Sequence, residues 1–133
     1  MITDLKSLED RYFQVRTKAE ADEYLTECGA ENAMVSIHNP DGIYGNVSKT
    51  CQTLIGYKPK ELIGNSPYDY FHAEDFQTIL KSHAKVTVRT EVDKVDYRLR
   101  MPDGNFREVT SFSRQVKDPS GLEFILVLTF ERG

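Results

Sequence analysis

The sequence lacks the features that would place a chain in a membrane or brace it with disulfides. None of its apolar runs approaches the roughly 18 residues that a membrane-spanning helix needs, and Met1-Ile2-Thr3-Asp4 does not resemble the start of a secretory signal. The two cysteines, Cys28 and Cys51, lie far apart and form no CxxC pair, which favours reduced thiols. These absences predict a soluble cytoplasmic protein with no membrane partner.

Motifs of catalysis and phosphate binding are also missing. The chain has no Ser-His-Asp arrangement, no HExxH, no Walker loop and no paired carboxylates outside the predicted surface, so we expect no enzymatic activity. The enzymatic alternative is a small α+β cone-type hydrolase or isomerase with one carboxylate in a pocket. Glu108 is the candidate for that carboxylate, because residues four apart on a strand lie on the same face of the sheet. It would therefore point toward the pocket if Phe112 does.

The charge pattern gives no sign of a nucleic-acid partner. Acidic and basic residues are interspersed and the net charge is −4, so neither a nucleic acid nor an anionic membrane is expected as a partner. Some basic residues do gather toward the C-terminus. Because no aromatic platform is interleaved with them, we interpret them as a solvated strand face and not as a phosphate site: Lys94, Arg98, Arg100, Arg107, Arg114 and Lys117.

One kind of turn occurs three times: Pro40-Asp41-Gly42, Pro102-Asp103-Gly104 and Pro119-Ser120-Gly121. Proline presets φ for the second position of a type I turn, and glycine takes the left-handed conformation that lets antiparallel strands resume pairing. Each turn therefore predicts a hairpin. Together they predict one hairpin near residue 42 and a three-stranded meander from about 94 to 131, with a helical stretch between them.

The last strand of the meander differs from the others, because it is apolar at almost every position from Leu122 to Phe130. Both of its faces must be covered, which predicts a central place in the sheet. Two further strands are expected at 33–39 and 43–47. The chain is thus predicted to be an α+β domain with a five-stranded antiparallel sheet, short helices on its inner face and an N-terminal amphipathic helix on its outer face.

The N-terminal segment has a helical stripe and a restart. A capping box at 17–20 begins a second helix that ends at Gly29. Two heptads are too few for an independent coiled coil, so the stripe must be buried against the domain or against a second copy. The stripe residues recur at alternating spacings of three and four: Leu5, Leu8, Tyr12, Val15 and Ala19.

Short helices with clear start and stop signals fill the middle of the chain. Ser48 is expected to cap a helix that stops at Gly56, and Pro59 opens another that stops at Gly64. Acidic residues at 74 and 75 begin a longer helix and complement its dipole. Its apolar face is predicted from the spacing i, i+3, i+4 and i+7: Phe76, Ile79, Leu80 and His83.

At this point the residues resemble the PAS family. The runs SKTCQTLIGY at 48–57 and KPKELIG at 58–64 are similar to the helical core of PAS domains, FHAED at 71–75 to their "iHpeD" segment, YRLRMPDG at 97–104 to "yRl-x-r-x-DG" and QVKD at 115–118 to "pv-x-D". The resemblance covers about residues 33–131. No single piece is specific, but the five pieces stand in the family's order and spacing.

The resemblance implies five antiparallel strands that cup short helices, often around a cavity. It implies a non-catalytic role in sensing a ligand, light, redox state or gas, or in dimerising, within a signal-transduction protein of the two-component or cyclic-nucleotide type. Residues 1–30 would be a helical cap that dimerises, and residues 31–133 the sensor domain. Leu128-Thr129-Phe130 stands where many members have Asp-Ile-Thr. Because the chain stops at Gly133, either an effector domain was removed or the module acts on a partner signalling protein in trans.

A cavity between helices and sheet would have mostly apolar walls with polar handles at Tyr57, His83 and Tyr97, which suits an aromatic or fatty ligand. The same walls suit a cavity filled by its own side chains. The expected lining residues are Leu54, Ile55, Tyr57, Phe71, Phe76, Ile79, Leu80, His83, Tyr97, Leu99, Phe112 and Leu126.

The cofactor stays open. Haem members of the family use a histidine on the long helix, which makes His83 the candidate ligand, although a structural role or contact with a small molecule is favoured. Flavin photoreceptors carry a cysteine motif that this chain lacks, and Cys51 is interpreted as a small core residue. His72 is interpreted as a helix-entry residue, and no metal site is expected.

A homodimer is predicted through the N-terminal stripe. On that hypothesis Leu8→Asp or Val15→Asp gives folded monomers, because the two side chains would be buried only at the interface. A protein-protein interaction module without any ligand is the alternative function.

Overall fold

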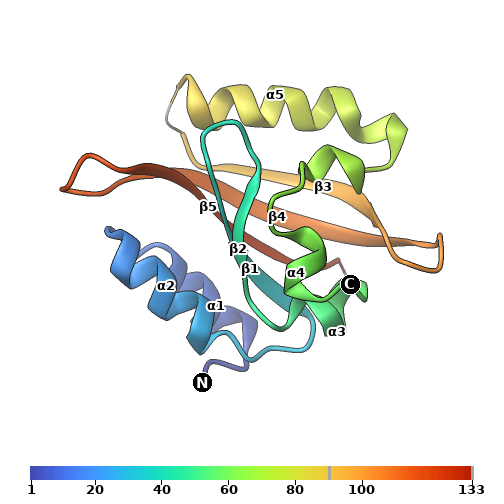
Figure 1. Cartoon of the computed structure of the whole chain (residues 1–133), viewed down its shortest axis with the longest axis horizontal. Coiled ribbons are helices and arrows are strands. Elements are labelled where there is room, and N and C mark those ends of the chain that lie inside the picture. The colour runs from blue at the N-terminus through green and yellow to red at the C-terminus, as the bar shows by residue number, and fades with distance from the viewer. Residues whose placement is uncertain (90, 133) are drawn as a thin grey trace.

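A computed structural model describes residues 1–89 and 91–132 of the chain, and Gly133, the end of the predicted sensor domain, lies outside them. None of the helices in this part of the chain is long and apolar enough to cross a membrane. Figure 1 shows the elements in chain order: α1 (Leu5–Tyr12), α2 (Lys18–Glu27), β1 (Ala33–His38), β2 (Tyr44–Val47), α3 (Cys51–Ile55), α4 (Pro59–Leu62), η1 (Pro67–Asp69), η2 (Ala73–Asp75), α5 (Phe76–Thr87), β3 (Asp93–Arg100), β4 (Phe106–Lys117) and β5 (Glu123–Glu131).

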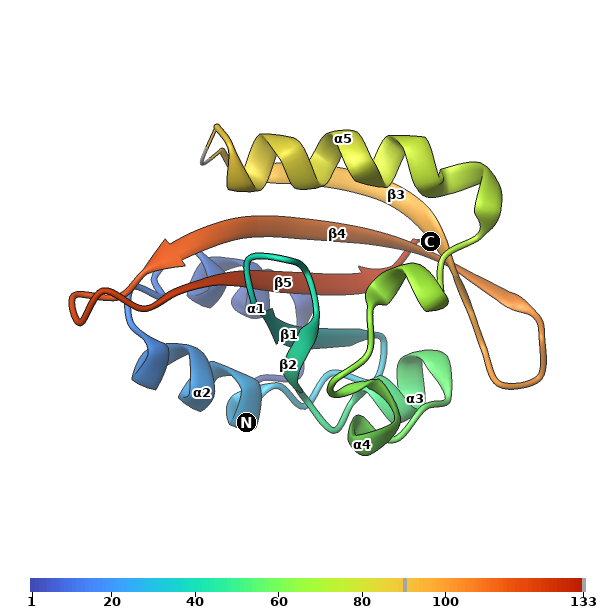
Figure 2. The same ribbon diagram turned by 45° about the horizontal axis from the view of Figure 1, so that its top comes forward.

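The five strands form one antiparallel sheet in the order β2-β1-β5-β4-β3. The apolar strand β5 is therefore central, as its sequence predicts. The helices α1 and α2 lie on one face of the sheet, the outer face, and α5 lies on the opposite, inner face (Figure 2). The predicted α+β architecture, a five-stranded antiparallel sheet with short helices on its inner face, is confirmed.

All three proline-glycine turns form as predicted. In each, the glycine N–H donates to the carbonyl three residues earlier, over 2.8 Å for Gly42 and Gly121 and 2.9 Å for Gly104. The φ angles of these glycines are 91°, 98° and 88°. A side chain would be strained there, so the turns explain where the hairpins close.

The outer layer is built from α1 and α2. Thr17 caps α2 as predicted, because its hydroxyl accepts from the N–H of Glu20, but Glu20 reaches back to the N–H of Arg16, one residue before the position that a capping box requires. The helix α1 ends at Tyr12, so the predicted stripe does not run on one helix to Ala19. Tyr12 instead anchors α1 to the sheet, since its hydroxyl donates 2.8 Å to the carbonyl of Leu126.

Arg114 of β4 fixes the end of α1. Its guanidinium donates 2.6 Å hydrogen bonds to the carbonyls of both Tyr12 and Val15 and lies over the Tyr12 ring at 5.1 Å. Carbonyls at a helix C-terminus lack partners within the helix and carry partial negative charge, which a guanidinium satisfies. A residue 102 positions after Tyr12 thus satisfies the carbonyl at the end of the first helix.

The predicted dimer stripe is therefore wrong for its central residues. Leu8, Tyr12 and Val15 are fully buried in the chain's own outer core, together with Leu126 and Leu128. Leu5 is half-buried and Ala19 is exposed. The sheet of the same chain covers the stripe, so the stripe has no need of a second copy.

An irregular segment closes part of the β3 edge. Arg100 N–H donates to the Tyr70 carbonyl over 2.8 Å, and His72 N–H donates to the Arg98 carbonyl over 3.2 Å. The Asp75 carboxylate accepts from both the N–H and the guanidinium of Arg98, at 2.9 to 3.1 Å. The Arg98 side chain holds the pKa of Asp75 below its usual value. The helices of the inner face are thereby tied to the sheet edge.

Replacing Leu8 tests the burial of the stripe. We expect Leu8→Ala to lower the free energy of unfolding by about 2–5 kcal/mol, because the cavity lies within a closed core. Urea unfolding measures this. Leu122→Ala is the control, since Leu122 is 48% exposed and its loss should change stability by less than about 0.5 kcal/mol. If Leu8→Ala instead unfolds as the wild type does and a dimer is lost, the N-terminal stripe is a dimer interface after all.

Candidate ligand cavity

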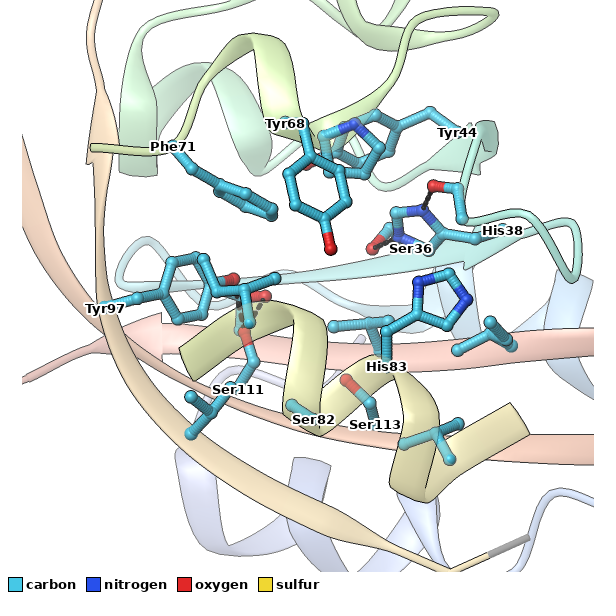
Figure 3. Close-up of a pocket in the computed structure, with 18 residues that line it drawn as sticks. Ser36, His38, Tyr44, Tyr68, Phe71, Ser82, His83, Tyr97, Ser111 and Ser113 are labelled. Atoms are coloured by element: carbon cyan, nitrogen blue, oxygen red, sulfur yellow. Dashed lines mark hydrogen bonds between the residues drawn. The ribbon is translucent and has the colours of Figure 1, made fainter. Parts of the chain in front are cut away.

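A cavity of about 90 Å³ lies between α5 and the inner face of the sheet, under Tyr68 and the β1–β2 hairpin (Figure 3). By the same measure a single buried water needs roughly 10–15 Å³, and pockets for drug-sized ligands begin near about 300 Å³. The space therefore fits a few waters or one small molecule. Its polar lining residues are Ser36, His38, Tyr44, Tyr68, Ser82, His83, Tyr97, Ser111, Ser113 and Thr129.

The strands β3, β4 and β5 supply a row of hydroxyl groups at one end of the cavity. Tyr97 Oη and Ser111 Oγ are 2.6 Å apart, and Ser111 Oγ lies 2.7 Å from Thr129 Oγ1. All three residues are buried. Burial raises the pKa of Tyr97, and the hydrogen bond with Ser111 opposes that shift. The row is a neutral set of paired donors and acceptors.

The strand β1 supplies a second polar pair, Ser36 and His38. His38 Nδ1 is 2.8 Å from the Gly42 carbonyl, and its Nε2 is 2.8 Å from Ser36 Oγ. A carbonyl only accepts, so Nδ1 carries the proton and Nε2 accepts from the serine hydroxyl. Burial lowers the pKa of His38 from 6.5 to about 4. The imidazole is therefore neutral near pH 7.

A serine that donates to a histidine is also the geometry of a nucleophile and its base. A general base works best when its pKa lies near the working pH, and the pKa of His38 is about 4. The predicted carboxylate does not complete a site either, because Glu108 is exposed and lies 3.1 Å from the Arg132 guanidinium. Neither His38 nor Glu108 therefore provides the base that the enzymatic alternative would need.

His83 connects α5 to the tip of the β1–β2 hairpin. Its Nε2 lies 3.0 Å from the Pro40 carbonyl and so donates to it. A Cβ at Gly42 would lie 3.2 Å from the His83 ring, so glycine also permits this close approach. The hairpin tip is thus held between the rings of His38 and His83.

The Tyr68 hydroxyl points into the cavity (Figure 3). It is a buried atom that finds no hydrogen-bond partner among the described residues. Its ring is held in place by edge contacts with Phe71 and Phe76, at 5.2 and 5.6 Å between ring centroids. A ring held in this way presents one donor and acceptor to whatever fills the space.

Only part of the predicted lining is found at the cavity. Phe71, Ile79, His83 and Tyr97 do line it. Leu54, Ile55, Tyr57 and Leu99 are buried in the inner core but lie outside the lining.

The predicted face of α5 is wrong in two places. Phe76 is 36% exposed and Leu80 is 49% exposed, while Ile79, Ser82 and Val86 form the buried face. The helix packs through Ile79, Ser82 and Val86, which are spaced i, i+3 and i+7. The predicted face did not include Ser82, because its hydroxyl interrupts an apolar pattern at this spacing.

The predicted parity of β4 is inverted. Phe112 and Leu126 pack against α1 in the outer core and not in the cavity. Ser111 and Ser113 point inward in their place. Each face of β4 places an apolar residue in a core, Val109 on the inner side and Val116 on the outer side, so the alternation of apolar and polar residues does not identify the inner face. The alternate serines beside Phe112 were the signal that could have found them.

A haem or flavin does not fit the cavity. The volume of about 90 Å³ lies far below that of pockets for large organic ligands, and His83 Nε2 already donates to Pro40. Residues 1–89 and 91–132 contain no group of three or more His, Cys, Asp or Glu side chains that could hold a metal ion. Burial raises the pKa of the Cys51 thiol to about 11, and its Sγ lies 3.2 Å from the Tyr57 carbonyl, as expected for a core thiol.

An antiparallel five-stranded sheet that cups short helices around a small cavity defines a class of α+β sensory domains. The chain belongs to the PAS family, since the family model described as the PAS fold matches residues 45–128.

Two proteins with related sequences support membership of the PAS family. Protein cycle of Drosophila melanogaster is 32% identical over 95 residues, which cover 69% of this chain and 23% of that protein. The human Basic helix-loop-helix ARNT-like protein 1 is 33% identical over 73 residues, which cover 54% of this chain and 12% of that protein. The matched part is thus less than a quarter of either relative. Expectations of two-component or cyclic-nucleotide signalling find no support in them.

Solved structures of a related PAS-B domain are also similar. The wild-type Drosophila melanogaster Cycle PAS-B domain with bound ethylene glycol has a TM-score of 0.69 and 27% identity, covering 74% of this chain and 99% of that one. A tryptophan-to-alanine variant of the same domain with bound glycerol has a TM-score of 0.64 and 29% identity, covering 72% and 94%.

The neutral state of His38 predicts a pH dependence. Because its folded pKa of about 4 lies below the unfolded value of 6.5, the unfolded chain binds the proton first. The contribution of His38 to the free energy of unfolding is then fully present above about pH 6.5. It falls as the pH is lowered toward 4, by up to about 1.4 kcal/mol per pH unit. We expect His38→Gln to remove this slope in urea unfolding measured between pH 7 and 5. An imidazole of His38 that titrates near 6.5 by NMR would contradict the assignment.

Proposed function

We propose that this chain is a non-catalytic PAS module that binds a small molecule in its cavity and passes the occupancy of that cavity to a protein partner. The observation that carries the proposal is the Tyr68 hydroxyl, buried in the cavity wall without a partner among the described residues. A buried hydroxyl without a hydrogen bond costs about 1–3 kcal/mol. A ligand or water that bonds to Tyr68 recovers that free energy.

The lining favours a small hydrogen-bonding ligand over the aromatic or fatty one that the sequence suggested. The Tyr68 hydroxyl finds no partner among the described residues and would stay unpaired against a hydrocarbon, whereas the row of hydroxyls on the strands and the His38 imidazole already have partners. The volume of about 90 Å³ also excludes long chains. The ethylene glycol and glycerol named with the related Cycle PAS-B structures are molecules of this class.

A route for the signal starts at His83. The residue lines the cavity and at the same time holds the hairpin tip through the Pro40 carbonyl. A ligand that competes for the imidazole would loosen that hydrogen bond. The hairpin and α5 are therefore the elements proposed to move with occupancy.

Conservative removal of one hydroxyl tests ligand binding. We expect Tyr68→Phe to weaken binding of glycerol, used as the probe, about 2- to 10-fold, the equivalent of one neutral hydrogen bond. Titration followed by amide chemical shifts gives the dissociation constant. Tyr57→Phe is the matched control, because its hydroxyl donates to the Arg100 carbonyl away from the cavity. Equal affinity of Tyr68→Phe and wild type, or shifts confined to other surfaces, would contradict the proposal.

A second candidate function, pairing with another copy, is supported by the part of the outer sheet face that α1 leaves open. Phe13 is 44% exposed, and its ring lies 6.0 Å from Phe112, which lies 6.0 Å from Phe130. Lys94 and Asp96 stand beside these rings on β3. Asp96 also accepts from Thr110 and lies 3.6 Å from Arg132 but keeps 55% of its side chain exposed, so a two-fold axis can bring Lys94 of one copy near Asp96 of the other, which favours a homodimer.

A charge introduced into the aromatic patch formed by Phe13, Phe112 and Phe130 tests the pairing of two copies. We expect Phe13→Glu to produce monomers of wild-type stability, because Phe13 is outside the closed core and a buried carboxylate would be left unpaired at the interface. Light scattering across a range of concentrations measures the mass. Phe106→Glu is the matched control, with Phe106 41% exposed on another surface. If Phe13→Glu associates as the wild type does, this face is not the interface.

A further inference from the structure

The outward side of α5 carries an apolar row that the described part of the chain leaves largely exposed, with only Phe76 partly covered by the Tyr68 ring. The row follows every fourth residue, at Phe76, Leu80, Ala84 and Val88. Phe76 is 36%, Leu80 49% and Val88 79% exposed. The opposite side of the helix packs on the sheet through Ile79, Ser82 and Val86, so the row lies on the exposed side of α5. Large apolar side chains gathered in one line mark an interaction site more often than scattered ones do.

The apolar row is flanked by positive charge. Lys81 and Lys85 stand one position after Leu80 and Ala84, and so form the neighbouring row on the helix. The twelve residues of α5 include no Asp or Glu, although the whole chain has a net charge of −4. Lys85 lies 3.6 Å from Asp93 and keeps half of its side chain exposed. Among the ion pairs of the described residues, none includes Lys81.

We propose that this face of α5 is a docking surface for an acidic amphipathic helix of a partner protein. Apolar side chains of the partner would pack along the row, and its acidic side chains would meet Lys81 and Lys85. Rows of every fourth residue pack against each other at a crossing angle of about −50°. The row spans about 18 Å at 1.5 Å per residue, which matches some three turns of partner helix.

A second copy of this chain fits the surface less well. Pairing of α5 with α5 offers Lys81 and Lys85 no acidic partner, because α5 carries none. Contact of α5 with a different surface of another copy would be heterologous and would extend into a filament unless it closed. Charge complementarity therefore selects an acidic segment from another protein.

The inner side of the same helix supplies Ile79, Ser82, His83 and Val86 to the cavity wall. A partner on the outer side and a ligand on the inner side would then act on one rigid element. Affinities at two sites that share such an element are coupled reciprocally. The docking proposal does not depend on this coupling, because the surface exists without a ligand.

The test uses the full chain without added ligand and a synthetic peptide of 18 residues with leucine at every fourth position and glutamates beside each leucine. We expect saturable amide shifts along residues 76–88 and an affinity that falls as salt is raised. Leu80→Asp should weaken binding at least about tenfold, as removal of a central apolar contact does. Leu122→Asp is the matched control, since Leu122 is 48% exposed on the β4–β5 turn, and it should bind as the wild type does.

Charge reversal completes the test. Lys81→Glu should weaken binding of the acidic peptide and strengthen binding of a peptide with lysines in place of the glutamates. Shifts that map to the outer sheet face, equal binding of the acidic and basic peptides, or equal loss in Leu80→Asp and Leu122→Asp would overturn the proposal. Because no ligand is present, any of these results leaves the proposed cavity function untouched.

Discussion

The structure depends on the burial of β5 on both of its faces. Leu126 and Leu128 pack outward into one core, while Ile125, Val127 and Thr129 face the cavity on the other side. A strand of this kind can lie only in the middle of a sheet that has a layer on each side. The helices α1 and α2 supply one layer, and the segment from α3 to α5 supplies the other. Pairing of β5 with both β1 and β4 then joins the N-terminal hairpin to the C-terminal meander.

The two layers differ in chemistry, and this difference creates the site. The outer core is closed by aliphatic and aromatic side chains and is pinned by the hydrogen bonds of Tyr12 and Arg114. The inner layer places serine, threonine and histidine against the long helix instead. Small polar side chains fill less volume and pair with each other, so a space remains that a larger apolar residue would have closed. The PAS fold thus gains its cavity from the residues on one face of the sheet.

The element common to cavity and surface is α5. Its inner side faces the polar strands, His83 holds the β1–β2 hairpin, and its outer side carries the apolar row with Lys81 and Lys85. The Asp75–Arg98 pair anchors the start of the helix to β3. Because the start of α5 is anchored, a small displacement of the helix at the cavity would move its C-terminal end and the side chains on its outward face. This arrangement supports a sensing role more directly than a rigidly packed helix would.

Local chemistry by itself determined the three turns, the caps of α2 and α4, the end of α3 and the central place of β5, because each depends on residues adjacent in the chain. The family resemblance of the helical core is likewise carried by short runs of neighbouring residues. Tertiary packing alone decided which side of β4 faces inward, which residues of α5 are buried, and whether the N-terminal stripe meets its own sheet or another copy. An apolar stripe shows only that something covers it. What covers it depends on contacts such as Arg114 to Tyr12, between residues far apart in the chain, and these form only when the sheet has assembled.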